Sequence, residues 1–170
     1  FMIDLEKEKY GFQDLVEIMA RLRGPGGCPW DIEQTHESIR RNFIEEVYEA
    51  CEAIDNDDQA GLCEELGDVL LQVVFHADIA KSEGAFDLDD VGTGICKRLI
   101  LRHPHIFGDV KADTAGQVLE NWEAIKKVEK SQKTYTQTLE AVAKSLPALI
   151  YAEKVQAKAR KAGFDWDTVD

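Results

Sequence analysis

The stretch EEVYEACEAIDNDDQAGLCEELGDV, residues 45–69, decides the fold of this chain. Glutamates gather near both of its ends, and DNDD (55–58) lies between them. Asp and Asn favour tight turns because their side chains bond to the nearby backbone. Apolar residues on either side of this turn recur every three or four positions, which predicts two amphipathic helices. Helices joined by a short turn pack antiparallel, so the stretch predicts a helical hairpin.

The rest of the chain has the same helical periodicity, and no segment alternates apolar and polar residues as a strand does. The segment RGPGGCPW (23–30) should interrupt the helices because glycine and proline disfavour them. The sequence therefore predicts an all-α protein. The predicted helices cover residues 5–23, 35–55, 59–82, 87–103, 114–130 and 147–161.

The composition of the chain argues against several classes of function. The net charge of −13 argues against nucleic-acid binding, which requires a basic surface. No apolar run of about 18 residues is present, so we expect no membrane span, and the N-terminus lacks the apolar core of a signal peptide. The four cysteines form no CxxC pair, and Cys51, Cys63 and Cys96 lie in helical, mostly apolar contexts. They predict reduced, buried thiols in a cytoplasmic protein.

The acidic residues of the hairpin are spaced for metal binding. Glu46 and Glu49 are three residues apart, as are Glu65 and Asp68, so each pair shares a helix face. The midpoint of the two pairs falls near residue 57, inside the turn. Antiparallel helices should therefore bring the four carboxylates to the same level, where they would repel one another. Mg²⁺, or alternatively Mn²⁺, would relieve that repulsion because both cations prefer oxygen ligands.

Other interpretations of these acids remain open. Two solvated acidic helix faces would have the same composition. A di-iron carboxylate bundle needs ExxH pairs, and His76 has no glutamate three residues before it. Glu45 and Glu64 could flank the site as an outer metal ligand or a catalytic base, or could be solvated.

Candidate phosphate-binding residues follow the hairpin. Lys97, Arg98 and Arg102 lie on one predicted helix, and Trp122 precedes Lys126 by four residues on the next. An aromatic face beside a lysine suits a nucleotide. Basic residues near a helix C-terminus also stabilise its dipole, and a single tryptophan is often a core residue. GCPWD (27–31) could be a lid, a loop that contacts a base, or a packed connection.

Several motifs, in this order, resemble the MazG family of nucleoside triphosphate pyrophosphohydrolases from about residue 10 to residue 166. They are GCPWDIEQTHESI, EEVYEACEAI, EELGDVLLQVVFHADIA, FDLDDV, RHPHIFG, NWEAIKKVEK and SLPALIYAEKVQAKARKAGFDW. The resemblance implies a four-helix-bundle core with additional C-terminal helices, and a homodimer or a dimer of dimers. It implies Mg²⁺-dependent hydrolysis of nucleoside triphosphates to the monophosphate and pyrophosphate.

The resemblance also implies roles for particular residues. Glu46, Glu49, Glu65 and Asp68 match the family's metal ligands. Residues 42–45, which include Asn42, and the basic residues Lys97, Arg98 and Arg102 match nucleotide contacts, as do Trp122 and Lys126. Residues 1–130 would form the pyrophosphohydrolase domain, and residues 131–170 a helical extension that leads into a second, related domain absent from this chain.

Two other functions fit the same residues. A related pyrophosphohydrolase could act on dUTP, dCTP or phosphoribosyl-ATP, because the acidic motif does not distinguish these substrates. A non-catalytic acidic helical module that binds a protein partner would need no metal-dependent turnover.

Overall fold

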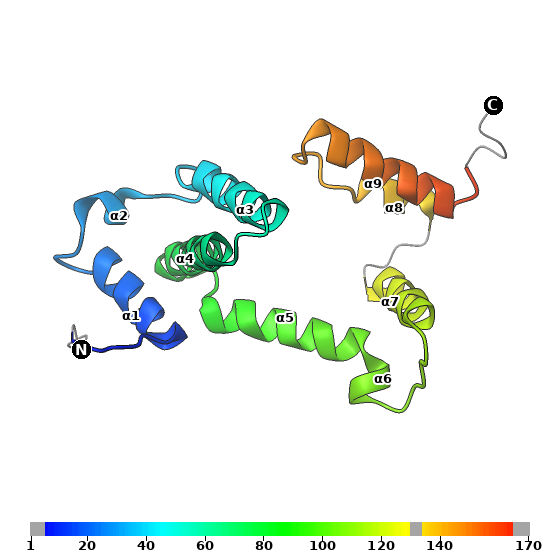
Figure 1. The fold of residues 1–170 in the computed structure, drawn as a ribbon, viewed down its shortest axis with the longest axis horizontal. Coiled ribbons are helices and arrows are strands. Elements are labelled where there is room, and N and C mark those ends of the chain that lie inside the picture. The colour runs from blue at the N-terminus through cyan, green and yellow to red at the C-terminus, as the bar shows by residue number, and fades with distance from the viewer. Residues whose placement is uncertain (1–5, 130–133, 165–170) are drawn as a thin grey trace. The chain divides into compact units, whose positions relative to one another are not determined.

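The computed structural model describes residues 6–129 and 134–164, and all the regular secondary structure in these ranges is helical, with no strand among them (Figure 1). The prediction of an all-α protein is confirmed. The chain divides into two compact units, residues 1–95 and 96–170, which are described separately. The helices are α1 (Phe12–Arg23), α2 (Pro29–Glu33), α3 (Arg40–Asp55), α4 (Gln59–Ser82), α5 (Leu88–Arg102), α6 (Pro104–Phe107), α7 (Ala115–Glu129), α8 (Tyr135–Glu140) and α9 (Ala148–Lys161).

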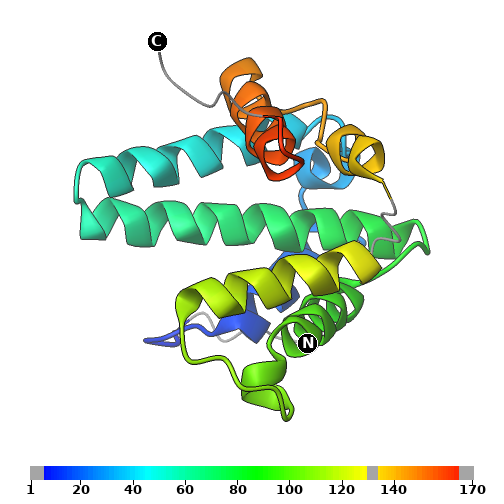
Figure 2. The same cartoon turned by 90° about the vertical axis from the view of Figure 1, so that its right-hand side faces the viewer.

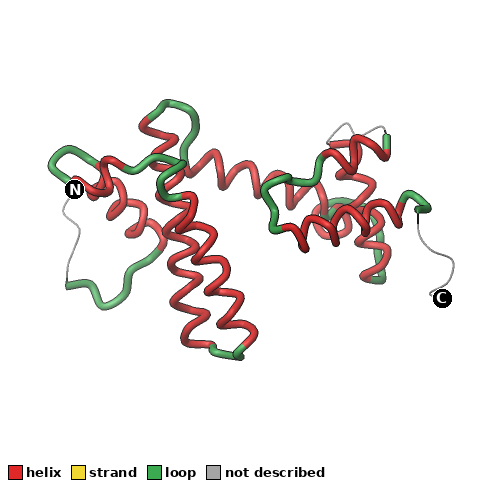
Figure 3. The backbone as a smooth tube through the Cα atoms, turned by 90° about the horizontal axis from the view of Figure 1, so that it is seen from above, coloured by secondary structure: helices red, strands yellow, loops and turns green. Residues whose placement is uncertain are grey.

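Helices α3 and α4 form the predicted antiparallel hairpin, and they lie side by side along their length (Figures 2 and 3). The turn between them is built by its acidic residues. Asp57 adopts a left-handed conformation, with φ of 53°. The carboxylate of Asp58 accepts hydrogen bonds from the backbone N–H groups of Ala60 (3.1 Å) and Gly61 (3.0 Å), and so caps α4. The predicted bounds of α4 are correct.

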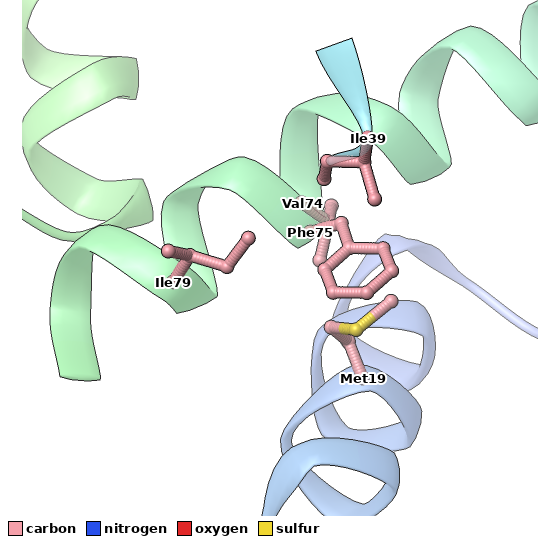
Figure 4. Close-up of a cluster of buried hydrophobic side chains, with 5 residues drawn as sticks. All are labelled: Met19, Ile39, Val74, Phe75 and Ile79. Atoms are coloured by element: carbon pink, nitrogen blue, oxygen red, sulfur yellow. The ribbon is translucent and has the colours of Figure 1, made fainter. Parts of the chain in front are cut away.

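The core of the first unit forms where α4 meets α1 and the residue before α3 (Figure 4). Met19 and Ile39 are almost completely buried, and they pack with Val74, Phe75 and Ile79 of α4. This cluster is small. Met19 and Ile39 belong to predicted apolar stripes, but Val74, Phe75 and Ile79 are not in the stripe that apolar spacing predicted for α4. The burial of this cluster fixes which side of α4 faces inward, and thereby orients the rest of the hairpin.

Two predicted helix starts need correction, and three short helices among the described residues, α2, α6 and α8, were not predicted. Helix α1 begins at Phe12 and not near Leu5, which lies outside the described residues; the Gly11 N–H instead donates to the Asp14 carboxylate at 2.6 Å. Helix α3 begins at Arg40, because Ser38 and Thr35 bond to each other's backbone in a turn. The first of the three short helices, α2, begins inside the segment RGPGGCPW at Pro29, since proline at the first position of a helix loses no helical hydrogen bond.

Arg23, at the end of α1, joins three parts of the first unit. Its Nε donates to Asp78 of α4 at 2.9 Å, and its Nη1 donates to the backbone carbonyls of Asp31 and Gln34. The guanidinium also lies 5.2 Å from the ring centroid of Phe75. With only 8% of its side chain exposed, Arg23 anchors the Asp31 end of GCPWD, whereas Trp30 in the same segment is 57% exposed.

The hairpin leaves apolar side chains exposed in the single chain. Ile54 is 60% exposed and Leu66 54%, and Val47, Tyr48 and Leu70 are also exposed. We call these five residues the hairpin apolar face. The prediction of buried thiols is wrong for Cys51, Cys63 and Cys96, which are exposed, although all four cysteines are free. The four-helix-bundle core stays a prediction, because the described contacts of this hairpin do not complete it.

The second unit has its own partly buried ion pair. Arg102, at the end of α5, donates from Nε and Nη2 to one carboxylate oxygen of Glu129 in α7, at 2.9 and 2.8 Å. Helices α8 and α9 pack against each other. The predicted domain boundary at residue 130 lies outside the described residues. No described helix is both long enough and apolar enough to cross a membrane.

Candidate metal centre

The hairpin brings three of the predicted metal ligands together. Glu46 and Glu49 project from α3 and Glu65 from α4, and one carboxylate oxygen of each lies within 4.8 Å of the other two. Glu46 and Glu65 are half-buried, whereas Glu49 is exposed. The α-helical spacing of each pair and the position of the turn explain this convergence.

The closeness of these carboxylates also raises the pKa values of two of them. Burial raises the pKa of Glu46, and the charges of Asp68, Glu49, Glu65 and Glu45 raise it further. Burial, followed by the charges of Glu49, Asp68 and Glu64, likewise raises the pKa of Glu65. Asp68 therefore lies close enough to act on both glutamates. We call Glu46, Glu49, Glu65 and Asp68 the acidic cluster.

The acidic cluster is suited to a hard divalent cation. It offers carboxylate oxygens only. Mg²⁺ and Mn²⁺ prefer such oxygen ligands, whereas soft metals prefer sulfur ligands. Because Mg²⁺ binds oxygen at about 2.0–2.1 Å, ligand atoms on opposite sides of the ion lie about 4.2 Å apart. The three glutamate oxygens lie within 4.8 Å of one another, which is compatible with binding to one ion. A cation would also remove the repulsion that raises the two pKa values.

The residues predicted to flank the cluster lie on the same hairpin. Glu45 and Glu64 are both exposed, and each raises the pKa of the neighbouring glutamate. The Glu45 carboxylate accepts a hydrogen bond from Arg41 Nε at 2.7 Å, whereas Glu64 has no such described contact. Asn42 is half-buried and lies one helical turn before Glu46.

The predicted basic and aromatic contacts belong to the second unit. Arg102 and Trp122 come together, with the guanidinium 5.4 Å from the ring centroid, while His103 meets the same ring edge-on at 4.9 Å. Lys126 lies 3.6 Å from Glu123. Lys97 and Arg98 are exposed on α5. Arg102 thus has a structural partner in Glu129, which its position in the sequence did not indicate.

Two further polar features of the first unit were not predicted. His36 and His76 face each other with their Nδ1 atoms 2.8 Å apart and their rings stacked. Burial, and to a lesser extent His36, lowers the pKa of His76. Gln72 is only 5% exposed, and its Oε1 has no hydrogen-bond partner among the described residues. Gln72 and His76 lie four and eight residues after Asp68 on α4, but no local signal in the sequence pairs His76 with His36.

These observations define an all-α protein with a cluster of oxygen ligands between the two helices of an antiparallel hairpin. Residues 34–107, which contain that hairpin, match the MazG nucleotide pyrophosphohydrolase domain. The chain therefore contains a domain of the MazG family.

Similar proteins agree with this assignment. The chain is 46% identical over 156 residues to the nucleoside triphosphate pyrophosphohydrolase of Escherichia coli K12, covering 91% of this chain and 59% of that protein. It is 48% identical over 155 residues to the nucleoside triphosphate pyrophosphohydrolase/pyrophosphatase MazG of Thermotoga maritima, with the same two coverages. The crystal structure of a mazG-related protein from Thermotoga maritima matches with a TM-score of 0.58 and 28% identity, over 68% of this chain and 98% of that one. The chain thus spans about three-fifths of the length of the two curated relatives.

Proposed function

We propose that this protein hydrolyses nucleoside triphosphates to the monophosphate and pyrophosphate in the presence of Mg²⁺, and that it removes unwanted nucleotides from the cytoplasmic pool. The observation that carries the proposal is the convergence of the glutamates from α3 and α4, within a domain whose curated relatives are named for this reaction. Mn²⁺ would support the same chemistry because it takes the same ligands.

The residues of the hairpin would have different roles in the reaction. The acidic cluster would hold the metal, which neutralises developing phosphate charge and makes bound water more acidic. Glu64 or Glu45 would orient the attacking water and accept its proton. Asn42 lies on the side of Glu46 away from the turn, where it would contact the nucleotide.

We propose phosphate-binding roles for cationic side chains of the second unit. Lys97 and Arg98 are exposed on α5 and would meet the β- and γ-phosphates. Lys126 would add a further charge, and Trp122 an aromatic surface. Because Arg102 is bound to Glu129, we propose that it contributes chiefly by holding Trp122.

Product analysis tests the reaction. With Mg²⁺ and a nucleoside triphosphate labelled at the α-phosphate, all label should appear in the monophosphate, with one pyrophosphate released per turnover. Labelled diphosphate, accompanied by orthophosphate, would place cleavage at the other anhydride bond and contradict the proposal. The absence of Mg²⁺-dependent turnover across a panel that includes dUTP, dCTP and phosphoribosyl-ATP would favour the non-catalytic module.

We propose that a second copy of the chain covers the hairpin apolar face, giving a homodimer in which two hairpins form a four-helix bundle. The exposed Ile54, Leu66 and Leu70 support this, since apolar side chains of one helical pair are buried well by another. Light scattering of the wild type should give twice the mass of one chain. The Leu66→Glu variant should have the mass of a single chain. A wild-type protein that is monomeric at high concentration would contradict the dimer.

A further inference from the structure

Gln72 occupies a position on α4 where a polar residue is unexpected. It is one helical turn beyond Asp68 and two beyond Glu65, and residues at this spacing share one face of a helix. At 5% exposure it is among the described residues buried by the packing of the first unit. A buried carbonyl oxygen without a partner lowers stability, and a leucine or methionine would avoid that penalty.

The direction of its side chain points to a role. Helical side chains lean toward the N-terminus of their own helix and cover the preceding turn. For Gln72 the preceding turn carries Asp68, which lies about 6 Å away along the helix axis. On the other side, the Nδ1 atom of His76 is already engaged by His36. This general preference of helical side chains would direct Oε1 toward the acidic cluster, and Oε1 still lacks a hydrogen-bond donor among the described residues.

The chemistry of the cluster identifies that donor. An acidic cluster of carboxylates offers acceptors only, so Gln72 Oε1 finds no donor among those side chains. Mg²⁺ and Mn²⁺ in such sites keep several water ligands, whose protons are donated to surrounding acceptors. We propose that Gln72 accepts a hydrogen bond from a water ligand of the metal held by the acidic cluster, and is a positioning residue for that ion. This inference rests on the proposed metal-dependent function.

The test is a titration with Mn²⁺ alone, in which the electron paramagnetic resonance signal of the free ion gives the dissociation constant. Gln72→Met keeps the length of the side chain but removes the acceptor. It should weaken Mn²⁺ binding about tenfold and raise the melting temperature in EDTA. Gln72→Glu keeps an acceptor oxygen at the same place and should retain Mn²⁺ binding. Gln59→Met makes the same change at an exposed position of α4 and should match the wild type in both measurements.

The outcomes separate this inference from the proposed function. If Gln72→Met binds Mn²⁺ as tightly as the wild type, or if Gln72→Glu loses binding, Gln72 does not act on the metal's water. If the wild type and Gln59→Met both fail to bind Mn²⁺, the metal site itself is wrong, and the role of Gln72 with it. The Gln72→Glu result also decides the question if Gln72→Met does not fold.

Discussion

Replacing Glu46 by glutamine should lower Mg²⁺-dependent hydrolysis about 100-fold or more while making the metal-free protein more stable. The loss of activity follows because a ligand that stabilises transition-state charge typically contributes at least ~2.7 kcal/mol. The gain in stability follows from the pKa of Glu46, which burial and the neighbouring carboxylates raise above its usual value of 4.5. A raised pKa means that stability present at low pH is lost as the pH rises through it. At neutral pH a glutamine at position 46 avoids this loss.

Thermal unfolding with and without Mg²⁺ measures both effects. The wild type should gain about 2.7 kcal/mol at a Mg²⁺ concentration one hundred times Kd, whereas Glu46→Gln should gain much less. Glu52→Gln, an exposed change on the same helix, is the matched control and should behave like the wild type. Full activity in Glu46→Gln at saturating Mg²⁺ would remove Glu46 from the site.

Replacing Arg23 by leucine should lower the free energy of unfolding by about 3 kcal/mol, the lower end of the usual result of removing one partner of a buried ion pair, because Asp78 is 23% exposed. The change leaves Asp78 without its cation and releases the backbone carbonyls of Asp31 and Gln34. It also removes the guanidinium from the face of Phe75, a core residue. Urea unfolding, followed by circular dichroism, measures the loss.

Two further variants make this prediction specific. Arg21→Leu, two residues earlier, removes an exposed guanidinium that bonds only to the Pro25 carbonyl among its described contacts, and should cost less than about 1 kcal/mol. The double change Arg23→Leu with Asp78→Leu should cost less than the sum of the single changes, because it leaves no unpaired charge. Equal losses in Arg21→Leu and Arg23→Leu would show that the ion pair does not stabilise the fold.

The sequence predicted the parts of the molecule that depend on local periodicity. The bounds of α4 and the antiparallel hairpin follow from the apolar spacing and from the capping aspartate Asp58. The convergence of Glu46, Glu49 and Glu65 followed from the same geometry, since a turn at residue 57 fixes which levels of the two helices meet. Local signals were sufficient because residues close in sequence make these contacts.

The features that the sequence missed depend on distant partners or on exposure. Arg102 binds Glu129, 27 residues away, and Arg23 binds Asp78, 55 residues away; neither pairing has a local signature. The apolar stripes predicted buried helices, but periodicity does not state what covers a stripe, and Ile54 remains exposed in the single chain. Helix α2 was missed because the glycines and prolines of residues 23–30 indicate that a helix ends there. Pro29, one of these residues, is also the first residue of α2.

The most direct test of the metal site is anomalous diffraction from a crystal grown with Mn²⁺. The acidic cluster predicts a peak at bonding distance, about 2.2 Å, from carboxylate oxygens of Glu46, Glu49 and Glu65. The same peak should be absent from crystals of Glu46→Gln under identical conditions. A protein that hydrolyses its substrate in Mn²⁺ but shows the peak away from these three glutamates would contradict the central claim.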